Sequence, residues 1–168
     1  DEVVDQVKSA VALAKPGEWI QGRGWHQSKW APQPKNMVKG FQTHEKLSAV
    51  SPHNPVYLVH ASGHAAMVNA AAMTIADIHS ETEVEGDGEV IKDDQLRPTG
   101  ILNEKASNLV KQYIPDPDDA VRARALTLAL EEMARHGITS FQDAGAGKVE
   151  IALFKNFLKQ NKLSTRLW

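Results

Sequence analysis

The sequence predicts an α/β fold, and two observations lead to this prediction. The last third of the chain alternates helix, strand, helix and strand with short links, from a helix over 120–136 to a strand over 163–168. Such alternation implies parallel strands joined by right-handed crossovers. Near the middle, an apolar β-type run over 56–60 ends in a small-residue turn, and an Ala-rich, helix-type run over 65–75 follows. A strand, a tight turn and a helix in this order form the repeating unit of α/β proteins.

The first 26 residues predict one helix and one strand. Residues 1–14 place apolar side chains along one helical stripe, and Pro16-Gly17 ends the helix. A strand over 19–25 follows, and its glycines permit close approach of the backbone.

The middle of the chain, residues 27–113, is less regular, and we interpret it as an inserted α+β region. The expected elements are a loop over 27–39, a short helix over 43–50 with Thr43 as its N-cap, a strand over 56–60, a helix over 65–75, a β-hairpin of 88–92 and 97–102 with a polar tip, and a helix over 103–113.

The last part, residues 114–168, contains the clearest helix boundaries. Asp116-Pro117-Asp118-Asp119 caps the helix over 120–136, and Gly137 ends it. A buried-type strand over 138–143, an amphipathic helix over 149–160 and the final strand complete this part.

Composition excludes several classes of protein. The chain has 168 residues, 42% of them hydrophobic and 24% charged, with a formal net charge of −2. This balance gives no electrostatic case for a nucleic acid or an anionic membrane as partner. No apolar run approaches the ~18 residues of a membrane span, and no signal peptide is visible, so the expected location is cytoplasmic. Cysteine is absent, which removes disulfides, thiolate ligands and a cysteine nucleophile.

His64 is the first candidate for chemistry. It follows Gly63 in the turn after the strand over 56–60, and the carboxyl end of a strand is where α/β proteins bind ligands. The alternative is a histidine that caps the next helix or packs in the core. His60 lies four residues earlier, a spacing that pairs metal ligands on a helix, but here it straddles a strand and a turn.

Three further positions have both a functional and a structural interpretation. Asp143 ends the strand over 138–143, where a carboxylate can contact a ligand or move a proton, or form only a local turn. Trp25, next to His26, offers an aromatic wall or a core side chain. Glu104 stands at an expected helix start, where the helix dipole favours an acid whatever its function.

Taken together, these motifs resemble one family. The segments that carry the resemblance are Gly22-Arg23-Gly24-Trp25, Leu47-Ser48-Ala49-Val50-Ser51-Pro52, Asn54-Pro55-Val56-Tyr57-Leu58-Val59, Gly63-His64-Ala65-Ala66-Met67-Val68-Asn69, Gly88-Glu89-Val90-Ile91, Arg97-Pro98-Thr99-Gly100-Ile101-Leu102 and Gly137-Ile138-Thr139-Ser140-Phe141-Gln142-Asp143-Ala144-Gly145. In order and spacing they are similar to the YtcJ-like branch of the amidohydrolase superfamily, amidohydrolase family 3, which includes N-substituted formamide deformylases.

The resemblance implies a partial (β/α)₈ TIM barrel of the metal-dependent hydrolase type. A complete barrel takes roughly 200 residues or more, and this chain begins within a helix and ends within a strand, so we interpret it as an internal fragment. Residues 1–26 would be an early barrel helix and strand, 27–113 the insertion, and 114–168 further βα units.

The family's chemistry uses a divalent metal, with zinc as the expected ion, to activate water for hydrolysis of C–N bonds in small amide-type substrates. The family's His-X-His ligand pair is absent from this sequence. The resemblance therefore assigns no metal ligand here, and we expect the chain alone to bind no metal and to be inactive. The resemblance implies that Trp25, His64 and Asp143 contact substrate. Of these, His64 is the catalytic candidate, as a hydrogen-bond donor to the substrate or the transition state.

A second hypothesis comes from another class of protein. The same residues could form a non-catalytic α/β module that binds a small molecule or associates with a second copy through exposed strands.

Overall fold

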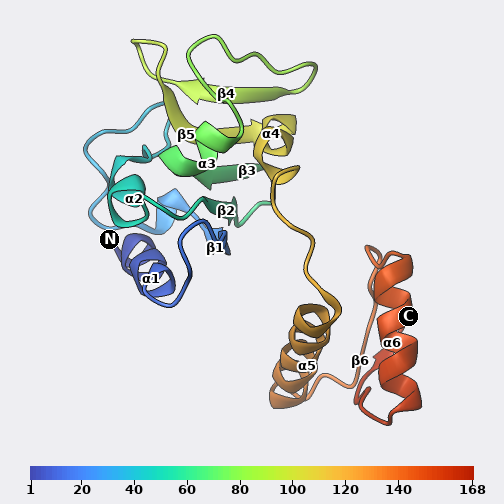
Figure 1. Ribbon diagram of the computed structural model, residues 1–168. Helices are drawn as coiled ribbons and strands as arrows, with labels where there is room; N and C mark the ends of the chain where they lie inside the picture. The colour runs from blue at the N-terminus through green and yellow to red at the C-terminus, as the bar shows by residue number, and fades with distance from the viewer. The chain divides into compact units, whose positions relative to one another are not determined.

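The computed structural model describes all residues from 1 to 168, and the chain divides into two compact units, Asp1–Pro115 and Asp116–Trp168 (Figure 1). The elements of the first unit are α1 (Glu2–Val11), β1 (Ile20–Trp25), the 3₁₀ helix η1 (Gln27–Lys29), α2 (Glu45–Val50), β2 (Val56–His60), β3 (Ala65–Val68), α3 (Ala70–Ile75), β4 (Gly88–Lys92), β5 (Pro98–Glu104), the 3₁₀ helix η2 (Lys105–Ser107) and α4 (Asn108–Lys111).

The first unit is built on a mixed five-stranded sheet in the order β1-β2-β3-β5-β4. β1 and β2 are parallel, whereas the other neighbours are antiparallel. β2 is buried along nearly its whole length, as expected of a strand that is covered on both faces. β1 lies at one edge of the sheet, so the backbone groups on its outer side have no strand partner.

Helices cover both faces of this sheet. On one face, apolar side chains of α1 and α2 pack with Val56, Leu58 and Ile101. On the other face, α3 and α4 pack with Tyr57 and Leu102. Consecutive strand residues alternate between the two cores because side chains of a strand point to opposite faces. The predicted α/β class is therefore confirmed as a three-layer arrangement, in which helices lie on both sides of the sheet.

An irregularity in β1 decides which of its side chains faces the core. Arg23 pairs with Val59, but the next partner of β2, His60, lies opposite Trp25, so Gly24 is an extra residue. Gly24 adopts φ +94°, a conformation that side chains other than glycine rarely take. The extra residue turns Trp25 to the same face as Ile20, where both are buried.

Asn69 is a buried hydrogen-bonding centre between β3 and α3. Its Oδ1 accepts from the backbone N–H groups of Val56 (2.9 Å) and Ala72 (3.0 Å), the second being the N-cap bond of α3. Its Nδ2 lies 2.9 Å from the Ser51 carbonyl, 2.8 Å from Ser51 Oγ and 2.8 Å from the Asn54 carbonyl. The side chain is fully buried, and it fixes the start of β2 against the loop before it.

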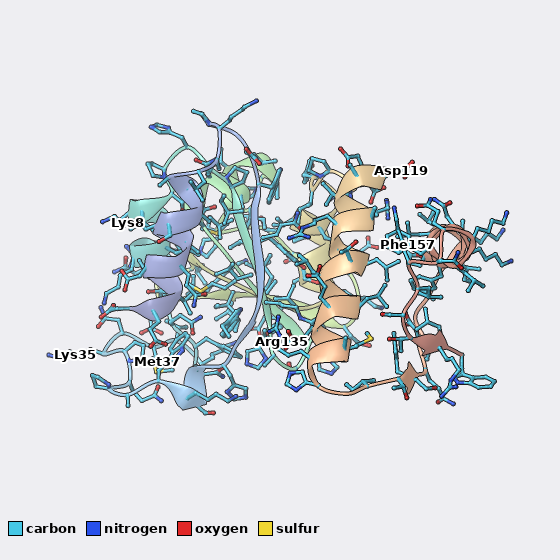
Figure 2. The ribbon with its side chains drawn as sticks, turned by 90° about the horizontal axis from the view of Figure 1, so that it is seen from below. Lys8, Lys35, Met37, Asp119, Arg135 and Phe157 are labelled. Carbon is cyan, nitrogen blue, oxygen red and sulfur yellow. The ribbon has the colours of Figure 1, made fainter.

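The second unit contains α5 (Asp119–Arg135), β6 (Ser140–Phe141), α6 (Lys148–Lys159) and β7 (Arg166–Leu167), and its two strands are parallel as predicted. Phe157 of α6 packs on Leu126 and Leu130 of α5, on the side of α6 that faces α5 (Figure 2). Asp118 accepts a bond from the Val121 N–H, and Gly137 adopts φ +69°, so both predicted ends of α5 are confirmed.

Four local predictions are wrong. The strand over 138–143, predicted to be buried, shrinks to β6, where Ser140 is exposed and Phe141 half-buried. The run over 65–75 is not one helix: residues 65–68 form β3, which pairs with β2 and β5, and only Ala70–Ile75 are helical. α2 begins after His44, so Thr43 is not its N-cap. The helix expected over 103–113 shrinks to Asn108–Lys111, because β5 continues to Glu104. For β3 and β5, pairing with distant strands outweighs the local preference.

The predicted hairpin over 88–102 is confirmed by the antiparallel pairing of β4 and β5. No helix of the structure has the length and apolar character that crossing a bilayer requires. The division into 1–26, 27–113 and 114–168 stays a prediction, and so does the partial barrel.

Candidate functional site

Histidine and tryptophan side chains meet where β1 and β2 end. The two strands are parallel, so their carboxyl ends lie at the same edge of the sheet. The Trp25 and His60 rings lie edge to face with centroids 4.5 Å apart, and Trp25 also stacks on Trp30 at 6.2 Å. The Trp25 indole N–H donates to the Leu58 carbonyl at 2.9 Å, which holds the ring in place.

His60 is buried, and both of its ring nitrogens have hydrogen-bond partners. Nδ1 accepts from the backbone N–H of Ser62 at 3.1 Å and lies 2.7 Å from Ser62 Oγ. Since Nδ1 is an acceptor, neutral His60 carries its proton on Nε2, which lies 3.1 Å from Gln27 Oε1. Burial lowers the pKa of His60, and the nearby imidazole of His26 lowers it further.

His26 follows β1 and lies beside His60, with ring centroids 4.7 Å apart. Its Nδ1 accepts from the Ser28 N–H at 3.3 Å and lies 2.8 Å from Ser28 Oγ. The same His-X-Ser turn therefore occurs twice, at 26–28 and at 60–62, and it orients two imidazoles at one edge of the sheet.

His64 lies in the turn of the hairpin between β2 and β3, not before a helix as the sequence suggested. Its Nδ1 is 3.1 Å from a carboxylate oxygen of Glu104, and both side chains are exposed, by 71% and 54%. The backbone N–H of Glu104 donates to the His64 carbonyl at 2.7 Å. The structure thus pairs two candidates that the sequence treated separately and leaves the second ring nitrogen of His64 open to a ligand.

Asp143 belongs to the second unit. Its Oδ1 accepts from the Gly145 N–H at 2.9 Å. This bond forms the local turn that was the structural interpretation of Asp143 from the sequence. Its own N–H donates to the Trp168 carbonyl at 3.2 Å, which prolongs the pairing between β6 and β7.

A groove of about 490 Å³ runs between α1 and the free edge of β1. Arg23, His26 and Lys29 supply positive or polar groups, while Trp25 and Trp30 supply aromatic surface. The groove could accommodate a small molecule or an extended chain segment.

Sequence reasoning missed Gln27 and Ser62 as members of the site. Gln27 fell in a segment interpreted as loop, and Ser62 in a turn. The repeated His-X-Ser spacing was the available indication, because a side chain two residues after a histidine can return to its Nδ1 in a tight turn.

The residues of this chain do not fit a metal ion. No three side chains of histidine, aspartate or glutamate converge in the structure. Both nitrogens of His60 and the Nδ1 atoms of His26 and His64 already have protein partners.

The fold of the chain is similar to that of two solved structures. It matches solved structures of uncharacterized metal-dependent hydrolases from Pyrococcus horikoshii OT3 (TM-score 0.59, 18% identity, 98% of this chain and 30% of that one) and Pyrococcus furiosus (TM-score 0.58, 19% identity, 99% and 31%). At this identity the similarity concerns the fold alone.

The sequence identifies the family. A profile described as "Amidohydrolase family" matches residues 1–168, and the chain belongs to this family. The predicted relationship, including its likeness to YtcJ and to N-substituted formamide deformylases, is thereby confirmed.

Three curated relatives share this region. The chain is 32% identical over 145 residues to "Protein LONG AFTER FAR-RED 3" of Arabidopsis thaliana (86% of this chain, 24% of that protein). It is 34% identical over 110 residues to N-substituted formamide deformylase of Arthrobacter pascens (66% and 19%). It is 27% identical over 139 residues to the amidohydrolase YtcJ of Bacillus subtilis strain 168 (83% and 25%). The chain thus spans at most a quarter of their length.

Proposed function

We propose that this chain is part of a metal-dependent amidohydrolase that hydrolyses C–N bonds of small amide-type molecules. Family membership over residues 1–168 carries the proposal. Because the chain spans only 19–25% of the curated relatives, we place the metal ligands, with zinc as the expected ion, outside these residues. The isolated chain is then inactive.

His64 is the residue of this chain that we assign to the substrate. Its Nδ1 lies 3.1 Å from a Glu104 carboxylate oxygen, so an Nδ1–H can donate to that oxygen, and Nε2, when it carries a proton, can donate to a substrate oxygen. Trp25 supplies a rigid aromatic wall to the groove beside β1. Asp143, which belongs to the second unit, is assigned to substrate contact separately from these residues. A donor that acts mainly on the transition state contributes about 10²–10³ in kcat.

Elemental analysis of the dialysed chain tests where the metal ligands lie. We expect far less than one equivalent of zinc, because no three suitable side chains converge. Stoichiometric zinc, or metal-dependent amide hydrolysis by these 168 residues alone, would contradict the proposal.

A second measurement tests the role of His64 in the complete enzyme. His64→Gln should lower kcat for an N-formyl or N-acyl substrate by about 10²-fold, if its donor acts in the transition state. His79→Gln is the matched control, since His79 is exposed and its Nδ1 bonds only to the N–H of Glu81. Equal kcat values for the two variants would show that His64 has no role in the reaction.

The free edge of β1 favours a second candidate function, self-association of the chain. Residues 21–24 are exposed, and an unpaired strand edge offers N–H and C=O groups to a second copy. Sedimentation velocity should show a dimer that Arg23→Pro weakens, because proline removes a donor from the edge. A monomer at all concentrations would exclude this function.

A further inference from the structure

Three serine hydroxyls lie beside histidine rings in this chain, and they differ in one respect. Ser28, Ser48 and Ser62 each place Oγ 2.7–2.8 Å from a histidine Nδ1. Among these histidines, only His60 also has a side-chain partner on its second nitrogen, the Gln27 Oε1 at 3.1 Å.

The arrangement around His60 suits a base that removes a proton from Ser62. Nδ1 carries a lone pair toward the hydroxyl, because it already accepts the Ser62 backbone N–H. The Nε2–H points to Gln27, which holds both the ring orientation and the tautomer. The rings of Trp25 and His26 pack against the imidazole and restrict its rotation.

Ser62 itself is open to a reagent. Ser62 is exposed in the β2–β3 turn, whereas the neighbouring His60 is buried, with 7% of its surface exposed. The backbone N–H of His64 donates to Ser62 Oγ at 3.2 Å and would stabilise negative charge that grows on this oxygen. Burial and His26 lower the pKa of His60, so its imidazole is neutral and able to accept a proton at pH 7.

We propose that Ser62 is a base-activated nucleophile, with His60 as its base and Gln27 as the residue that positions His60, and that it reacts with activated acyl and phosphonyl compounds without a metal. A nucleophile, a base and an orienting group in hydrogen-bond contact are the parts that such chemistry requires.

With a fluorophosphonate, the step balances as a substitution at phosphorus. Ser62 Oγ forms the O–P bond, the P–F bond breaks, fluoride leaves with the bonding pair, and the hydroxyl proton moves to His60 Nδ1. This inference does not depend on the amidohydrolase activity proposed above, because it uses no residue or metal outside the 168-residue chain.

The experiment treats the purified 168-residue chain with a fluorophosphonate probe in the presence of EDTA and maps the adduct by peptide mass spectrometry. We expect labelling at Ser62 at least ~10-fold faster than at Ser28, which shares the exposed His-X-Ser turn but lacks the third residue. Ser62→Ala should abolish the principal adduct, and Ser28→Ala should leave it unchanged.

Variants of Gln27 separate orientation from folding. Gln27→Leu should slow Ser62 labelling, and Gln27→Glu should restore it, because glutamate keeps an acceptor for the Nε2–H of His60. Circular dichroism and tryptophan fluorescence check that both variants fold. No adduct at Ser62, or equal rates at Ser62 and Ser28, would overturn the proposal, and equal rates in the two Gln27 variants would overturn the positioning role.

Discussion

Replacing Asn69 by alanine should destabilise the first unit more than any surface change. The side chain is fully buried and has five hydrogen-bond contacts, in which its two amide hydrogens are shared among three acceptors. Truncation leaves the N–H of Val56, the N–H of Ala72 and the carbonyls of Ser51 and Asn54 without this partner. At a net ~1 kcal/mol per bond, and allowing for partial replacement by water, the loss is about 3–5 kcal/mol of unfolding free energy.

The assay is urea unfolding followed by tryptophan fluorescence. Trp168 lies in the second unit and the other three tryptophans lie in the first, so a Trp168→Phe background isolates the first unit. Asn36→Ala, at an exposed loop position, is the matched control and should shift the free energy by less than ~0.5 kcal/mol. A loss below ~1 kcal/mol for Asn69→Ala, at an unchanged m value, would refute the assignment of this residue as a hydrogen-bonding centre.

Two further predictions concern pH and backbone strain. The pKa values of His44 and His60 are lowered by burial, so below pH 6.5 the unfolded chain binds protons that the folded chain does not. The urea concentration at the midpoint of unfolding should therefore be lower at pH 5.5 than at pH 7.5. His60→Gln should make this difference smaller, and an unchanged difference would contradict burial of the imidazole as its cause. Gly100→Ala should cost ~2 kcal/mol or more, because a Cβ there would lie 2.5 Å from the Val68 carbonyl oxygen at φ +82°. Gly17→Ala, at φ +83° in open space, should cost only ~1 kcal/mol, and similar losses in thermal unfolding of both variants would argue against the steric reason.

Local chemistry made the second unit and the hairpin predictable. Asp118 and Gly137 each fix one end of α5 through bonds and backbone angles of residues close by in sequence, and the polar tip at 93–96 fixes the β4–β5 hairpin. Such features need no knowledge of distant residues, so a single sequence contains them.

The middle of the chain was less predictable because distant pairing decides it. Ala65-Ala66-Met67-Val68 has helical composition, yet its register between β2 and β5 makes it a strand. The same error placed His64 before a helix and concealed its contact with Glu104, which is 40 residues away. The roles of Gln27 and Ser62 were hidden for a similar reason, since Gln27 approaches His60 only when β1 and β2 lie side by side.

The extra residue at Gly24 has a consequence for comparing this chain with other sequences. Because the bulge absorbs Gly24, a sequence that lacks this residue would keep the tryptophan opposite His60 and facing the core. A residue that entered the ladder at position 24 would instead turn Trp25 out of the core and His26 into it. The side chain opposite His60 is therefore set by the pairing of β1 with β2, and it does not follow from counting residues along β1. An alignment gap placed one position away in this strand would assign the wrong residue to the edge of the sheet.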